Sequence, residues 1–203
     1  MAAFNDQSEK VVKSAEWRAK NFPLRKTEMA PIYNSKVMFY HGKARDGSPV
    51  LYFRGGLYDK NLGSPETYVL GAAHCIDEAL RETNASSLTI MLNASNVAGG
   101  VNSPADLNFI KAFVAVLREH YPGQMKRLIV YPFPWWARTI WSLVSVFLDK
   151  ATADLVVLLS GDVSCTAPPP KELFDYVDAS ELPVCCGGED QRPPVDILAT
   201  LSD

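Results

Sequence analysis

The chain lacks the features that mark several large classes of protein. Its 203 residues carry a formal net charge of only -3, so no excess of positive charge indicates a nucleic-acid partner. No apolar run follows the first residues, so no secretory signal is expected. The longest apolar stretch, 130–148, is interrupted by polar residues, Arg138 and prolines, which is not typical of a membrane span. We therefore expect a cytoplasmic protein.

Cysteine is scarce, and the motifs of catalysis are missing. The 4 cysteines form no Cys-x-x-Cys pair, and the adjacent Cys185 and Cys186 cannot by themselves make an ordinary disulfide. No Gly-x-Gly-x-x-Gly or Gly-x-x-x-x-Gly-Lys pattern occurs, and residues 160–162 (Ser-Gly-Asp) lack the Gly-x-Ser-x-Gly elbow of hydrolases. The three histidines have no metal-ligand spacing. The sequence predicts no enzyme activity, no metal site and no cofactor.

Helical and extended patterns alternate along the rest of the chain. Ser64 and Ser103, each followed by proline and then by a carboxylate, predict helices over about 65–82 and 104–121. A further helix is expected to begin at Ser8 and end at Pro23, followed by a polar connector over 24–35. Short apolar runs predict strands at 38–40, 50–53, 88–92, 128–131 and 155–159. Strands alternating with helices indicate an α/β fold around a mostly parallel sheet.

A helix predicted over 135–149 is more apolar than an ordinary surface helix. Its polar residues fall within about 60° of one another on a helical wheel, so most of its circumference is apolar. Three of the 4 tryptophans of the chain lie here. This pattern is typical either of a helix enclosed in the core, or of the wall of an apolar cavity or a lid that touches a membrane, because tryptophan favours boundaries between apolar and wet surroundings.

Several short motifs, in order, resemble the CRAL-TRIO lipid-binding family, in the type of the phosphatidylinositol/phosphatidylcholine transfer proteins. The motifs are Ser-Ala-Glu-Trp-Arg at 14–18, Phe-Tyr-His at 39–41, Asp-Gly-Ser-Pro-Val at 46–50, Tyr-Pro at 121–122, Pro134, Phe-Leu-Asp at 147–149, Glu-Leu-Pro at 181–183 and Gly-Gly at 187–188. The resemblance implies a curved, mostly parallel β-sheet flanked by helices, flooring a hydrophobic ligand pocket. It also implies a mobile helix that closes this pocket and opens at a membrane. We call residues 135–149 the gate helix.

The resemblance also divides the chain and assigns a site. Residues 1–35 would be a remnant of the family's N-terminal helical region, 36–190 the lipid-binding domain and 191–203 a flexible tail. The ligand-binding residues expected on the gate helix, on the strand opposite it and at the pocket floor are Trp136, Ile140, Trp141, Val144, Phe147, Tyr52, Phe53 and Leu155.

The expected function is binding, with possible transfer, of a lipid or other hydrophobic small molecule, with transient peripheral contact at a membrane. Phosphatidylinositol binders of the family carry a glutamate and a lysine where this chain has Gly123 and Leu155, so phosphatidylinositol is not the expected ligand. The alternative is a docking module for a protein partner, with the pocket filled, since aromatic side chains line or fill a cavity equally well.

Overall fold

The computed structural model describes residues 2–146 and 148–203, with side chains described from residue 11 onward. Phe147, one of the expected ligand-binding residues, lies outside the described residues. The helices are α1 (Ala2–Asn21), α2 (Lys26–Asn34), α3 (Pro65–Thr83), α4 (Leu107–His120), α5 (Arg138–Ser145) and α6 (Lys150–Ala153). The strands are β1 (Met38–Lys43), β2 (Pro49–Arg54), β3 (Leu88–Asn93), β4 (Met125–Phe133) and β5 (Val156–Ser160).

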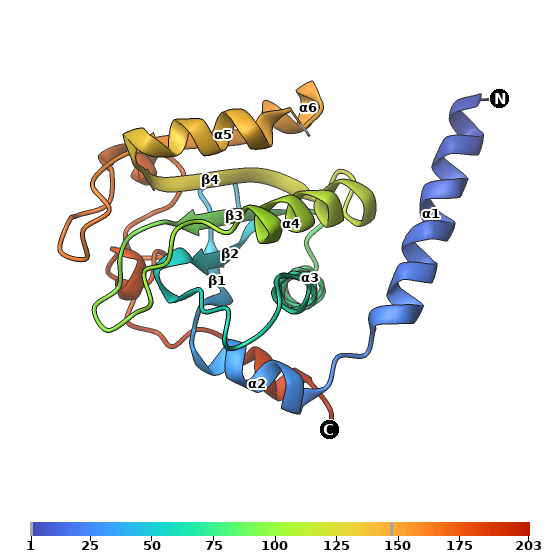
Figure 1. Ribbon diagram of the computed structural model, residues 1–203, viewed down its shortest axis with the longest axis horizontal. Coiled ribbons are helices and arrows are strands. Elements are labelled where there is room, and N and C mark those ends of the chain that lie inside the picture. The colour runs from blue at the N-terminus through green and yellow to red at the C-terminus, as the bar shows by residue number, and fades with distance from the viewer. Residues whose placement is uncertain (1, 147) are drawn as a thin grey trace.

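The sheet confirms the expected α/β fold. Its strands follow chain order, β1-β2-β3-β4-β5. The hairpin β1-β2 is antiparallel, as the Asp46-Gly47 turn predicts, and the other pairs are parallel. Because parallel strands need crossover connections, α3, α4 and the segment containing α5 lie between them in the chain. In Figure 1, α3 and α4 cover one side of the sheet, and α5 lies alongside β4.

Capping residues define the starts of α3 and α4. The cap of α3 lies where the sequence predicts it, and the cap of α4 does not. Ser64 Oγ accepts a hydrogen bond from the Thr67 amide at 3.2 Å, and Pro65 begins α3, as predicted. The prediction that Ser103 starts the next helix is wrong. Asp106 caps α4 instead, and its Oδ1 accepts from the amides of Asn108 (2.9 Å) and Phe109 (3.3 Å). A carboxylate oxygen that accepts two amides satisfies more of the free helix-end donors than a hydroxyl further upstream.

The expectation of a polar connector over 24–35 is also wrong, because α2 occupies most of it. Met29, Ile32 and Tyr33 are at most 2% exposed and belong to the main core. Because Pro31 and many charged residues surround these three side chains, the helical periodicity of the segment is not evident in the sequence. The burial of these three side chains, rather than helix propensity, therefore stabilises α2.

The expected flexible tail, residues 191–203, packs against the body of the protein. A 3₁₀ helix, η5 (Ile197–Thr200), places Ile197 at 3% exposure in the main core. The Lys26 amide donates to the carbonyl of Ser202 at 3.1 Å. The tail and α2 thus cover each other. The apolar residues of each segment are buried in part by the other, which explains why neither segment was recognised from its own sequence.

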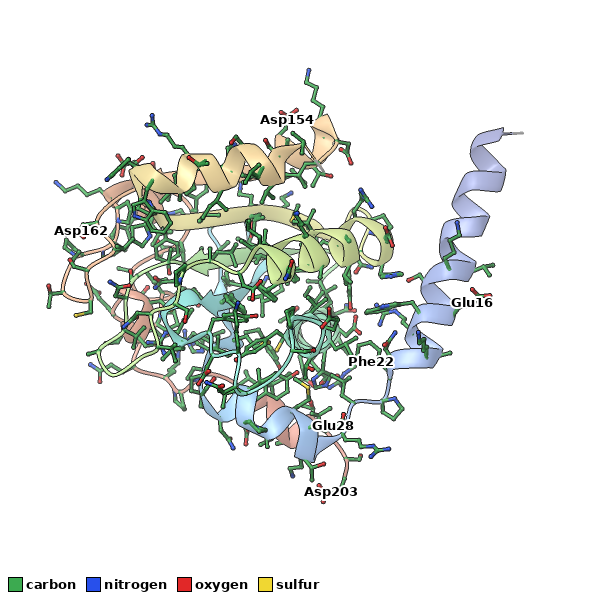
Figure 2. The ribbon with its side chains drawn as sticks, in the orientation of Figure 1. Glu16, Phe22, Glu28, Asp154, Asp162 and Asp203 are labelled. Atoms are coloured by element: carbon green, nitrogen blue, oxygen red, sulfur yellow. The ribbon has the colours of Figure 1, made fainter. Side chains whose placement is uncertain are left out.

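The helix α1 lies beside the body and meets it at its C-terminal end (Figure 1). Trp17 stacks on His120 of α4, with ring centroids 4.2 Å apart. Arg18 donates to both carboxylate oxygens of Asp77, at 2.5 and 3.0 Å. Figure 2 shows Phe22 at this end of α1, nearest to the body.

The sheet has a different core on each face. Side chains alternate along each strand, so Phe53 and Leu51 face the helices α3 and α4, whereas Tyr52 faces the C-terminal segment. We call these the helix face and the second face. On the second face, Tyr52 and Tyr131 pack with Leu173 and Cys186, which come from the 3₁₀ turns η3 (Lys171–Asp175) and η4 (Val184–Cys186).

Candidate functional site: an apolar cavity under the gate helix

One row of side chains crosses the helix face of the sheet. Phe53, Leu92, Val130 and Leu158 are register partners on β2, β3, β4 and β5 in turn. Leu92, Val130 and Leu158 are only partly buried. In contrast, Met91 and Ile129, their chain neighbours on the second face, are 0% exposed. A row that is apolar, central in the sheet and incompletely covered forms the floor of a cavity.

The helix α4 supplies one wall of this cavity. Ile110, Phe113 and Val114 recur at helical spacing on the side that faces the floor. Phe109 also lines the cavity and stacks on Phe53, with ring centroids 4.8 Å apart. Its own ring is only 5% exposed because Tyr58 and Phe113 also pack around it. This aromatic cluster makes the wall rigid, since each ring restricts the next.

The gate helix forms the opposite wall, although it is shorter than expected. Residues 135–149 divide into a 3₁₀ turn, η2 (Trp135–Ala137), and α5, after which Asp149 caps α6. Trp136, Ile140, Trp141, Val144 and Leu148 line the cavity. On the outer side, Trp135 is 82%, Val146 75% and Leu143 50% exposed. The segment is therefore apolar on the side facing the cavity and on much of the side facing solvent.

The cavity, which is open to solvent on one side, has a volume of about 550 Å³, within the range of ~300–1,000 Å³ typical of small-molecule sites. Its lining is apolar except at one end, where the side chains of Asn96, Asn102, Ser103 and Asp106 lie. Asn102 is used internally: its Oδ1 accepts from the Val97 amide at 2.8 Å, and its Nδ2 donates to the Val97 carbonyl at 3.0 Å.

Asp106, at this polar end, is 8% exposed. Burial acts to raise the pKa of its carboxyl group, but Lys60 Nζ at 3.0 Å and the Phe109 and Asn108 amides outweigh burial, and the pKa is lowered. Tyr58 also donates to Asp106 Oδ2 at 3.2 Å. The carboxylate is thus ionised and fully used in holding α4 and the loop, which leaves the cavity suited to an apolar ligand.

The structure brings most of the expected site residues together. Phe53, Trp136, Ile140, Trp141 and Val144 all line the cavity. Tyr52 does not, because strand alternation turns it to the second face, where it is 0% exposed and stacks on Phe39. Adjacent strand residues cannot both face one cavity, so only Phe53 could lie opposite the gate helix.

Leu155 is not at the floor of this cavity. It precedes β5 and lines a separate hollow with α6 and the end of α4. Val163, beyond the other end of β5, does line the cavity. In Figure 2, Asp154 and Asp162, the neighbours of these residues, lie far apart. The floor residue of β5 is Leu158, in register with Val130 of the neighbouring strand.

Floor residues Leu92, Val130 and Leu158 were not identified as ligand-contacting from sequence. The alternation of side chains along each strand indicates which face of the sheet each of these residues occupies. The register between strands, however, is needed to align them with Phe53. Among residues 2–146 and 148–203, no group of three or more His, Cys, Asp and Glu side chains could hold a metal ion. Nor is any helix in these ranges long and apolar enough to cross a membrane.

Comparison with known proteins identifies the family. The family model described as "CRAL/TRIO domain" matches residues 33–188. This chain therefore belongs to the CRAL/TRIO domain family, whose members typically bind lipids or other small hydrophobic molecules and are carriers rather than enzymes.

Patellin-3 of Arabidopsis thaliana is 23% identical over 166 residues, a match that covers 75% of this chain and 33% of Patellin-3. The chain thus spans about a third of this relative. The crystal structure of Sfh5 superposes with a TM-score of 0.60 at 16% identity, covering 91% of this chain and 66% of Sfh5. At this identity the likeness to Sfh5 shows a shared fold.

Proposed function

We propose that this protein binds one hydrophobic ligand, a lipid or another apolar small molecule, in the cavity between the sheet, α4 and the gate helix. The observation that carries the proposal is the floor row: Leu92, Val130 and Leu158 lie mid-sheet yet are incompletely covered. Leaving such a row uncovered costs about 25 cal/mol per Å² of apolar surface. A ligand that covers it recovers this free energy on binding.

Peripheral action at a membrane, in the cytoplasm, is the second part of the proposal. The outer surface of the gate helix exposes Trp135, Leu143 and Val146, directly over the cavity that Trp136 and Val144 line. An apolar outer surface can insert into the boundary between lipid headgroups and acyl chains. The same helix would then contact both the ligand and the bilayer, as transfer requires.

The ligand that we propose is zwitterionic, neutral or simply apolar, rather than phosphatidylinositol. Burying a phosphate without partners costs several kcal/mol. Gly123 and Leu155, which replace charged family residues, lie in a hollow outside the cavity. Arg138, on the gate helix, is exposed and is not among the residues that line the cavity. Among the described residues that line the cavity, none is Lys or Arg.

A docking module with a filled pocket is the alternative. The volume of about 550 Å³ favours the ligand-binding function, because side chains that filled the pocket would leave voids no larger than a few water molecules.

The deciding experiment is organic extraction and mass spectrometry of the purified full chain, beside the variant Val130→Trp, which fills the cavity from its floor. Roughly one lipid or other apolar molecule per wild-type chain, lost in a folded Val130→Trp variant, supports the carrier. If the wild type carries no ligand and takes up none from vesicles of phosphatidylcholine, the docking module is the better explanation.

A further inference from the structure

A cluster of polar and sulfur-bearing side chains lies on the second face of the sheet, away from the ligand cavity. Arg54, Asn93 and Tyr131 are register partners at the carboxyl ends of β2, β3 and β4. The turn η4, with Cys185 and Cys186, covers this end of the second face, and Tyr131 Oη donates to the Cys186 carbonyl at 3.4 Å. The proposed carrier function uses neither cysteine.

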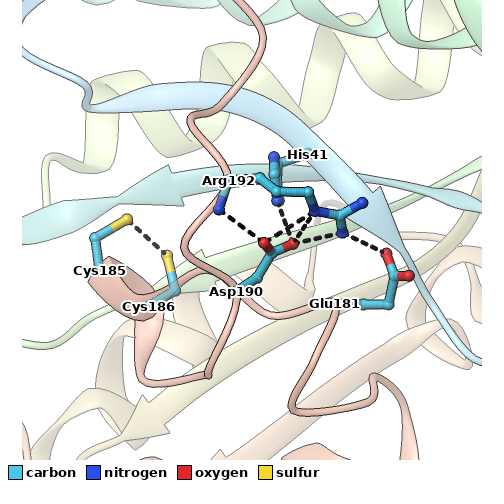
Figure 3. Close-up of polar contacts among 6 residues, drawn as sticks. All are labelled: His41, Glu181, Cys185, Cys186, Asp190 and Arg192. Atoms are coloured by element: carbon cyan, nitrogen blue, oxygen red, sulfur yellow. Dashed lines mark hydrogen bonds and ion pairs between the residues drawn. The ribbon is translucent and has the colours of Figure 1, made fainter.

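The turn presents the two thiols side by side. The Sγ atoms of Cys185 and Cys186 are 4.0 Å apart (Figure 3). Cys185 is exposed, whereas Cys186 is 2% exposed. The Val184 amide donates to the Asp190 carbonyl at 3.0 Å, which ties the turn to the segment that follows it, and the Cys186 amide closes the turn on the Pro183 carbonyl at 2.8 Å.

The chain that leaves the turn is also tightly held. Asp190 accepts from His41 Nε2 at 2.7 Å and from Arg192 Nε at 2.9 Å, and Arg192 reaches Glu181 at 3.3 Å (Figure 3). A Cβ at position 188 would lie 2.0 Å from the Leu182 carbonyl oxygen, so only glycine fits there. The backbone that follows the two cysteines is therefore held in place by the fold.

Positive charge and unsatisfied donors surround this pair. Arg54 Nε and Tyr52 Oη are buried and have no hydrogen-bond partner within the described residues. The Cys186 thiol donates toward Cys185, and Arg54 and His41 add positive potential. Together they outweigh partial burial and lower the pKa of the Cys185 thiol to about 6. The pKa of Cys186 is raised, first by its hydrogen bond to Cys185 and then by burial. The two shifts run in opposite directions, so Cys185 is the thiol of the pair that ionises more readily and Cys186 the one that keeps its proton.

We propose that Cys185 and Cys186 form a peroxide-sensitive dithiol, in which Cys185 is the attacking thiolate and Cys186 the resolving thiol. The Cys185 thiolate attacks one oxygen of a hydroperoxide. An S–O bond forms, the O–O bond breaks, and the leaving oxygen departs as hydroxide or alkoxide. Cys185 is thereby oxidised to a sulfenic acid and the hydroperoxide is reduced.

Cys186 then attacks the sulfenic sulfur. The S–S bond forms, the S–O bond breaks, and the oxygen leaves as water with the proton that Cys186 gives up. The sulfurs must approach from 4.0 Å to about 2.05 Å. Because the two cysteines are adjacent in the chain, the product is a strained disulfide between neighbouring residues rather than an ordinary one. Formation of the neutral sulfenic acid removes the thiolate charge that holds the pKa of Cys186 high, so the resolving thiol becomes easier to deprotonate once Cys185 has reacted.

The test is intact-mass spectrometry of the reduced full chain after treatment with hydrogen peroxide and the sulfenic-acid reagent dimedone. We expect the wild type to lose two hydrogen atoms per chain, reversibly with dithiothreitol, as a monomer. Cys186→Ser should instead accumulate the dimedone adduct at Cys185, and Cys185→Ser should give neither product. Cys165→Ser, which removes an exposed thiol elsewhere, should behave as the wild type.

A kinetic measurement tests the role of Arg54. At pH 6.5, the thiolate fraction of Cys185 is about 75-fold that of free cysteine, and its lower nucleophilicity offsets about 15-fold of this. Alkylation by iodoacetamide at Cys185 should therefore be about 5-fold faster than for free cysteine. Arg54→Met should slow it and Arg54→Lys should restore it, with unchanged circular dichroism. Oxidation divided equally between Cys185 and Cys165, a wild type that stops at the dimedone adduct, or a disulfide between chains would overturn the proposal.

Discussion

Replacing Trp141 with aspartate should weaken ligand binding more than tenfold while leaving the protein folded. Trp141 lies on α5, is only partly buried and lines the cavity. The substitution puts a carboxylate where the proposed ligand's apolar chain would lie. Since the position is partly open, this carboxylate can also reach water in the free protein, so the fold does not have to bury a charge.

The cost to folding follows from the area that the indole covers. A fully buried tryptophan removes ~150–250 Å² from water, so a half-buried one accounts for about 100 Å². At ~25 cal/mol per Å² the loss is at most about 2.5 kcal/mol. Part of this area faces the cavity rather than packed atoms, and we expect about 1–2 kcal/mol. A truncation in a filled core would cost ~3–5 kcal/mol.

The substitution lowers the free energy of ligand binding in larger proportion than it lowers the free energy of unfolding. If the indole covers about 70 Å² of the ligand, its loss weakens binding by about 1.75 kcal/mol, which exceeds a factor of ten. The carboxylate adds the penalty of desolvation against an apolar chain. Binding and transfer of a phosphatidylcholine with a fluorescent acyl chain should therefore fall more than tenfold, while guanidinium unfolding shows the small change above.

Thr139→Asp is the matched control. Thr139 lies on the same helix, is exposed, and is absent from the residues that line the cavity, so the same change of charge should leave lipid binding within about twofold of the wild type. Equal losses of binding in the two variants, or an unfolding cost of ~3 kcal/mol or more for Trp141→Asp, would refute the reasoning and favour a filled pocket.

Three further predictions concern the membrane, the headgroup and pH. Flotation with phosphatidylcholine vesicles should persist at high salt and weaken in Trp135→Ala, because apolar insertion is not screened; binding abolished by salt would point to the basic N-terminal segment instead. In competition between labelled phosphatidylinositol and phosphatidylcholine, we expect no preference for the inositol lipid. Preferential uptake that is sensitive to Arg138→Ala would show that a headgroup site exists on the gate helix. Burial lowers the pKa of His74 in the folded protein, where the His74 ring contacts Tyr33 Oη at 3.0 Å. As pH falls below about 6.5, His74 therefore takes up a proton in the unfolded chain before it does so in the folded protein. Urea unfolding should then show stability decreasing with falling pH until His74 protonates in the folded state as well, with a shallower slope in His74→Gln; parallel slopes would contradict this assignment.

Local patterns in the sequence were sufficient for the class of fold and for most elements. Ser64 with Pro65 encodes the start of α3, Asp46-Gly47 encodes the hairpin, and the apolar runs encode the strands, because each depends on interactions within a few residues. The excess of apolar residues on the gate helix is itself a property of the sequence, and it indicates that this segment borders something other than an ordinary core.

Only the tertiary structure decided which residues share the cavity. Phe53 and Tyr52 are equally apolar in sequence, and the register with Leu92 and Val130 selects Phe53. Met29 and Ile197 lie in segments that looked polar, and each is buried because α2 packs against α3, β1 and the C-terminal segment. Cys185 owes its proposed reactivity first to the adjacent Cys186 and then, in part, to Arg54, which lies more than a hundred residues earlier in the chain. Contacts between distant segments set burial and electrostatic potential, and no local pattern of residues encodes them.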